Sequence, residues 1–174
     1  GLIRQNEAFK QNPNQSLQVA NSIESILEKI ELEINVIEKN MELLIQTHHK
    51  EMFNHLQSIP GLGKKTSLFL IVISGGFSKF ENHKQLASYI GISPRIFESG
   101  TSVKGRSKIC KMGMSKIRAM LYVCAWSAKR CNKNCKELYE RLVENGKSKK
   151  LALIAVVNKL IKLAFAIATK KEYY

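Results

Sequence analysis

A chain of 174 residues with 44% hydrophobic residues is long enough for one domain, or one domain with an appendage, around a packed core. Its formal net charge of +14 favours a polyanionic partner, either nucleic acid or an acidic membrane surface. All 14 acidic residues are glutamates, which argues against a two-metal carboxylate cage within this chain, since such cages usually include aspartate.

The charge is divided unevenly along the chain. Residues 1–57 hold five Lys/Arg against eight Glu, a net charge of −3, so residues 58–174 carry +17. We therefore expect the polyanion to bind the second part. We predict a polar segment and a long helix over residues 1–57, and a compact helical domain over 58–174.

The first predicted element is a long exposed helix. Its apolar residues recur at spacings of three or four and form a heptad seam, made of Ala20, Ile23, Leu27, Ile30, Ile34, Ile37, Met41 and Leu44. We interpret this 20–44 seam as a coiled coil that makes the protein at least a homodimer. The alternative is an amphipathic helix packed on its own domain. The pattern loses its regularity after about His48.

The segment Pro60-Gly61-Leu62-Gly63 separates two helical stretches and resembles a helix-hairpin-helix. Glycines at 61 and 63 would let the turn expose backbone N–H groups, and the next helix would point its dipole at a phosphate. Lys64 and Lys65 add positive charge. We predict DNA binding by these four residues, Gly61, Gly63, Lys64 and Lys65. The alternative is an ordinary turn between two helices.

A short helix is predicted over 82–90, followed by an irregular loop or short β-hairpin over 95–110 with strands near Arg95–Glu98 and Ser107–Cys110. Residues 95–118 contain one acidic residue, Glu98, and many basic ones. The basic residues are Arg95, Lys104, Arg106, Lys108, Lys111, Lys116 and Arg118. Glycines such as Gly100 keep the backbone free to approach a ligand closely. The cations, hydroxyls and backbone N–H groups of this segment predict a phosphate-binding site. The alternative is a solvated loop.

Three further helices are predicted over about 114–130, 133–145 and 151–169, the last being an apolar core helix and not a membrane span. Trp126 is expected in the core, and the tail from Lys170 to Tyr174 is expected to fray. The four cysteines lack a paired C-x-x-C spacing, so we expect no zinc site and reduced thiols in a cytosol. The chain starts with Gly1 and lacks a signal peptide, and we interpret it as a fragment of a longer cytoplasmic, prokaryotic protein.

From Ile59 to about Lys170 the chain resembles the C-terminal transposase domain of the one-ten/one-sixteen insertion-sequence family, which is similar to pilin-gene invertases. The resemblance rests on motifs in the family's order; these are Ile59-Pro60-Gly61-Leu62-Gly63, Phe80 to Gly91 (F-x5-L-A-x-Y-x-G), Ser93-Pro94-Arg95, Ser99-Gly100, Gly105-Arg106-Ser107-Lys108-Ile109, Lys111-x-Gly113 and Gly146-Lys147. They extend over roughly two thirds of the chain.

The resemblance implies a full-length enzyme with an N-terminal RuvC-like domain that holds Mg²⁺ through an Asp-Glu-Asp-Asp set. It also implies a serine that becomes covalently joined to a DNA phosphate, at the position of Ser99 here. A structured bridge RNA would guide the oligomer to its DNA. This chain lacks the RuvC-like domain, so we expect it to hold no cofactor and to be inactive alone.

A serine hydroxyl needs a base, a lowered pKa or a metal to become a good nucleophile, and no His or Asp lies near Ser99 in sequence. Activation must therefore come from elsewhere. Arg106, with its neighbouring cations, would neutralise charge that builds on the phosphate. Ser102 is the alternative nucleophile. A non-catalytic nucleic-acid-binding module is the alternative function; a third, binding to an anionic membrane, is not expected.

Overall fold

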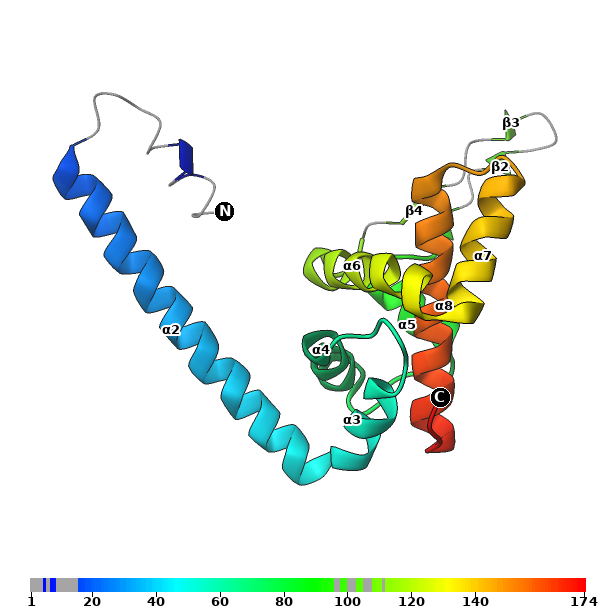
Figure 1. Cartoon of the computed structure of the whole chain (residues 1–174), viewed down its shortest axis with the longest axis horizontal. Coiled ribbons are helices and arrows are strands. Elements are labelled where there is room, and N and C mark those ends of the chain that lie inside the picture. The colour runs from blue at the N-terminus through cyan, green and yellow to red at the C-terminus, as the bar shows by residue number, and fades with distance from the viewer. Residues whose placement is uncertain are drawn as a thin grey trace. The chain divides into compact units, whose positions relative to one another are not determined.

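The computed structural model describes residues 5, 7–8, 16–95, 98–99, 103–104, 108–110 and 112–174. The described residues are mostly helical, which confirms the predicted fold class at this level (Figure 1). Two compact units make up the chain, Gly1–Leu44 and Ile45–Tyr174. The sequence pattern placed this division between residues 57 and 58.

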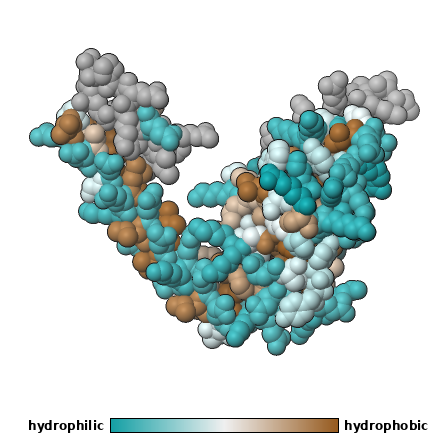
Figure 2. Space-filling model, in the orientation of Figure 1, coloured by the Kyte–Doolittle hydropathy of each residue, from teal (hydrophilic) through white to brown (hydrophobic). Residues whose placement is uncertain are grey.

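The first unit is dominated by α2 (Leu17–His48), a single helix of 32 residues whose last turn belongs to the second unit. No residue from Leu17 to Leu44 is buried. Four of the eight seam residues are exposed, with fractions of 39% at Ile30, 48% at Ile34, 56% at Ile37 and 61% at Leu44, and the other four are half-buried. Figure 2 shows brown apolar side chains along this helix. The end of α2 at His48 agrees with the loss of the heptad pattern there.

The second unit contains the remaining described helices. They are α3 (Lys50–Gln57), α4 (Lys64–Ser74), α5 (His83–Ile90), α6 (Ser115–Cys131), α7 (Lys133–Glu144) and α8 (Lys149–Lys170). The compact unit begins upstream of α3 because α3 buries Phe53 and Leu56 in the same core as the later helices. The core side chains of α5 and α6 that the apolar periodicity predicted, such as Leu86, Ile90 and Leu121, are all buried.

Helix α8 is the centre of this unit and packs against α3, α5, α6 and α7. Its buried residues lie on one broad face of the helix; they are Ala152, Leu153, Val156, Val157, Leu160, Ile161, Ala164, Ile167 and Ala168. By length and composition α8 could cross a membrane, but half of its apolar window is buried inside the unit. The burial is that of a core helix, as the sequence predicted.

Four two-residue strands lie between α5 and α6. Strand β1 (Pro94–Arg95) pairs antiparallel with β4 (Lys108–Ile109), and β2 (Glu98–Ser99) pairs antiparallel with β3 (Val103–Lys104). The chain therefore leaves α5, runs outward through β1 and β2, and returns through β3 and β4 to α6.

Two local expectations are wrong. Trp126 is 43% exposed, because the buried face of α6 is formed by Ile117, Leu121 and Ala125 and residue 126 lies off that face. The tail does not fray: the Tyr174 hydroxyl donates to Asn132 Oδ1 at 3.0 Å. The Tyr174 amide also donates to Ser58 Oγ at 2.8 Å, which ties the end of the chain to the turn after α3.

Candidate nucleic-acid interface

The two ends of the basic segment between α5 and α6 lie in contact with each other. Gly91 ends α5 in the left-handed region, with φ +83°, and a Cβ there would lie 2.6 Å from the Gly113 nitrogen. A Cβ on Gly113 would overlap the carbonyl oxygens of Tyr89 and Ile90. The two ends of segment 91–113 therefore touch backbone to backbone, which only residues without side chains allow.

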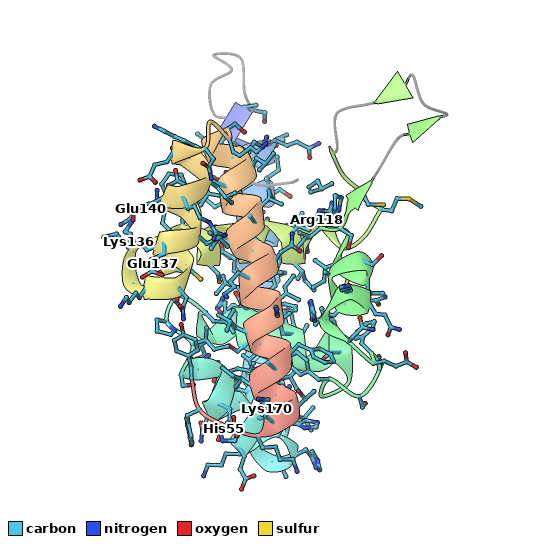
Figure 3. All side chains as sticks on the ribbon, turned by 90° about the vertical axis from the view of Figure 1, so that its right-hand side faces the viewer. His55, Arg118, Lys136, Glu137, Glu140 and Lys170 are labelled. Atoms are coloured by element: carbon cyan, nitrogen blue, oxygen red, sulfur yellow. The ribbon has the colours of Figure 1, made fainter. Side chains whose placement is uncertain are left out.

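Arg118 completes this contact. Its Nη1 donates to the Ile90 carbonyl oxygen at 3.1 Å, so the guanidinium caps the last turn of α5 (labelled in Figure 3). Just outside, the Cys110 amide donates to the Ser93 carbonyl at 3.1 Å and starts the β1–β4 ladder. We call the group Ile90, Gly91, Gly113 and Arg118 the loop clasp. One predicted DNA ligand, Arg118, thus has a structural contact.

The β1–β4 ladder pairs Arg95 with Lys108, so two predicted phosphate ligands stand opposite each other in the backbone register. The β2–β3 ladder pairs Ser99 with Val103 and Glu98 with Lys104. Only the backbone of these strand residues is described from Arg95 onward. Four other predicted site residues lie outside the described part of the chain; they are Gly100, Ser102, Arg106 and Lys111.

The α3–α4 turn uses its two glycines differently. Gly61 has φ +96°, and a Cβ there would lie 2.5 Å from the Ala128 Cα of α6. Its role is close packing against α6. Gly63 is the exposed N-cap residue of α4, with no side-chain cap and no atom within 4 Å of an added Cβ. Lys64 and Lys65 follow it and are exposed, as is Lys116 at the start of α6.

Buried polar contacts hold this turn in place. Thr66 Oγ1 lies 3.2 Å from Cys124 Sγ and joins α4 to α6. Gln57 Nε2 donates to Ser67 Oγ at 2.7 Å and joins α3 to α4. The first turn of α4 is thereby fixed relative to both neighbours, and its exposed amino end has a defined position on the second unit.

The described residues contain no group of three or more His, Cys, Asp or Glu side chains that could hold a metal ion. Among the cysteines, burial raises the pKa of the Cys135 thiol to about 11, against a smaller opposing effect of Lys159. Cys135 is therefore a neutral thiol at physiological pH, which is the wrong state for a metal ligand.

Sequence reasoning missed two basic features. Lys129 Nζ lies 4.0 Å from the Trp126 ring centroid and 4.8 Å from that of Tyr139, so a cation sits between two aromatic rings on the surface. Lys159 and Lys162 line a groove beside α5. The sequence does carry a signal for this pair: lysines three residues apart within the apolar run lie on one side of α8.

A basic loop and exposed lysines at a helix end are features that many nucleic-acid-binding proteins share. Residues 53–140 match the family model described as "Transposase IS116/IS110/IS902 family". This match covers half of the chain, and the chain belongs to that transposase family. The resemblance noted in the sequence is confirmed.

Curated relatives carry related names. The chain is 35% identical over 113 residues to a "Pilin gene-inverting protein" of Moraxella lacunata, covering 64% of this chain and 35% of the relative. It is 29% identical over 136 residues to the "Transposase for insertion sequence element IS1111A" of Coxiella burnetii, covering 76% and 37%. An IS110 protein of Streptomyces coelicolor is 26% identical over 156 residues, covering 90% and 38%. The chain thus spans little more than a third of these relatives.

Proposed function

We propose that this chain is the DNA-binding and nucleophile-bearing part of a transposase or DNA recombinase. The observation that carries the proposal is the family match over residues 53–140, which includes the whole basic loop and the α3–α4 turn. The net charge of +17 on residues 58–174 supports a nucleic-acid partner. The names of the relatives, an inverting protein and a transposase, support DNA rearrangement as the reaction.

In the proposed reaction the Ser99 oxygen attacks a DNA phosphodiester. A bond forms between this oxygen and phosphorus, the bond from phosphorus to one deoxyribose oxygen breaks, and the serine proton leaves to a base as the sugar hydroxyl gains a proton. A hydroxyl of the new partner strand then attacks the phosphoserine and releases Ser99. Bond number and charge are conserved, so strands are exchanged without an external energy source.

The loop clasp supports this assignment by fixing the base from which the β1–β4 and β2–β3 ladders extend. Ser99 lies in β2 and pairs with Val103 of β3 in the backbone register. Arg106 is the proposed partner for charge that develops on the phosphate, with Arg95, Lys104, Lys108 and Lys111 as further loop ligands. Lys64, Lys65, Lys116 and Arg118 would contact the same backbone from the helix ends.

Magnesium does not fit the described residues of this chain, because they contain no group of three or more His, Cys, Asp or Glu side chains that could hold a metal ion. No step of the reaction is assigned here to a metal. We propose that the full-length enzyme holds Mg²⁺ in an RuvC-like domain outside this chain, uses a bridge RNA as guide, and associates through the exposed seam of α2, all in the cytoplasm of a prokaryote.

The test is an adduct assay with the full-length protein, its guide RNA, Mg²⁺ and labelled DNA. The proposal expects a covalent protein–DNA adduct in the wild type and in Ser102→Ala, and none in Ser99→Ala. If the adduct is lost in Ser102→Ala but kept in Ser99→Ala, Ser102 is the nucleophile. An adduct that survives both substitutions would refute both Ser99 and Ser102 as the nucleophile.

A non-catalytic nucleic-acid-binding module is the second candidate. It is favoured by one observation, that the described residues contain no group of side chains that could hold a metal ion for activating a serine. The same assay separates the two functions, since the module would bind DNA or RNA tightly yet give no adduct with any variant.

A further inference from the structure

We propose that a groove between α5 and α8 is a second contact site for the sugar-phosphate backbone of a nucleic acid. The inference rests on the proposed function, because it assumes that the chain binds nucleic acid. The groove has a volume of about 490 Å³, within the roughly 300–1,000 Å³ of typical ligand sites. Figure 3 looks onto this side of the second unit, with α8 in front, α7 on one side and α5 on the other.

Among the residues that the structure describes, three lysines line the groove and no acidic residue does. Lys84 comes from α5, while Lys159 and Lys162 come from α8. Lys84 and Lys162 are exposed, and Lys159 and the neighbouring Asn158 are half-buried. A merely solvated surface mixes both signs of charge, so three cations around one depression favour an anionic occupant.

The lining of the groove also includes the apolar residues Ala87, Leu138 and Ala155. A lining that combines cations with small apolar side chains matches a nucleotide, whose sugar and base have apolar faces while its phosphate needs cations and polar hydrogens. Asn158 adds an amide that can hydrogen-bond to a phosphate or a base edge. The charge complementarity therefore points to a nucleic-acid strand.

The groove also runs into the basic loop. Ser93 and Pro94 line it, and Pro94 is the first residue of β1, at the start of the basic loop. A nucleic-acid strand held by Lys84 and Lys162 would therefore lie beside the start of the loop that carries the proposed nucleophile. This continuity gives the groove a role in guiding the strand.

The neighbouring groove on the other side of Lys159 defines the limit of the site. There Lys159 and Arg141 face three glutamates, Glu137, Glu140 and Glu144. Lys159 lines both grooves, one with three glutamates and one with two further lysines. Lys84 and Lys162 are consequently the two residues that report on the proposed site alone.

The test compares two double variants of the 174-residue chain. Lys84→Gln/Lys162→Gln removes two charges from the groove, whereas Lys79→Gln/Lys170→Gln removes two exposed lysines that do not line it. Binding is measured with a 30-nucleotide duplex DNA, single-stranded DNA and single-stranded RNA of the same sequence, from low to high salt.

We expect the groove variant to bind at least one of the three probes about tenfold more weakly, and to lower the slope of log affinity against log salt by about 1.4–1.8. The control variant should change affinity by about threefold or less. The probe with the largest difference identifies the strand. Acetylation of Lys84 and Lys162, read by mass spectrometry, should be suppressed by that probe, while acetylation of Lys79 and Lys170 should not.

Equal weakening by both variants with all three probes, or unprotected groove lysines, would overturn the groove site while leaving the proposed function intact. A wild-type chain that binds none of the probes even at low salt would overturn both. The two failures are therefore distinguishable in one experiment.

Discussion

The loop clasp and the α3–α4 turn both owe their form to glycine, but they use it differently. In the clasp, Gly91 and Gly113 lie against each other and against the end of α5. In the turn, Gly61 packs on Ala128 of α6, while Gly63 faces open space at the start of α4. Three of these four glycines are thus required by packing, and only Gly63 leaves a backbone open to a ligand.

A glycine in a basic segment can therefore have either of two structural roles. Where an added Cβ would meet backbone atoms, the glycine builds the scaffold of the site. Where it would meet nothing, the glycine is available to a phosphate. Substitution by alanine separates these two roles.

Gly61→Ala should destabilise the second unit most, by about 3 kcal/mol, because it combines a positive φ with overlap of the α6 backbone. Urea unfolding followed by circular dichroism measures the change in the free energy of unfolding. A loss below about 1 kcal/mol would mean that the turn does not rest on Ala128.

Gly113→Ala should cost about 2 kcal/mol and should open the clasp locally, because its Cβ would overlap the carbonyls of Tyr89 and Ile90. The adduct assay on the full-length protein should also lose activity, since the ladders would no longer start from a fixed base. Unchanged stability together with unchanged adduct formation would contradict a closed clasp.

Arg118→Met should cost about 1–2 kcal/mol, because it leaves the Ile90 carbonyl without its charged donor. Lys116→Met is the matched control, since Lys116 is exposed on the same helix, and it should change stability by less than about 0.5 kcal/mol. If both substitutions weaken nucleic-acid binding but neither changes unfolding, Arg118 is a ligand only.

Gly63→Ala should change the free energy of unfolding by only about 0.5 kcal/mol, because nothing lies within 4 Å of the new methyl group. If a phosphate approaches this N-cap closely, the same substitution should weaken nucleic-acid binding severalfold. Equal losses of stability in Gly63→Ala and Gly61→Ala would erase the distinction between the two glycines.

Much of this fold could be predicted from the sequence, because apolar periodicity alone places α5, α6 and α8 and their buried faces. Leu86, Leu121 and Leu160 are each fully buried where that pattern requires it. The exposed stripe of α2 follows from the same rule, since a heptad seam on a polar helix has no core of its own to enter.

The clasp could not be predicted, because its parts are separated by more than twenty residues and no local pattern says which carbonyl Arg118 meets. Trp126 was misplaced because helix composition, and not its angular position, guided the expectation. The α5–α8 groove joins residues from α5, α7 and α8, so it exists only after the helices have packed.

Native-state hydrogen exchange at the base of the basic loop measures whether the loop clasp holds the two ends of the loop together. The amides of Gly91 and Ile92 are bonded to the Ala87 carbonyl, and that of Cys110 to the Ser93 carbonyl. We predict that these three amides exchange slowly in the wild type and become fast in Gly113→Ala, while α8 stays protected. Unprotected exchange at Ile92 and Cys110 in the wild type would contradict a clasp that holds the loop.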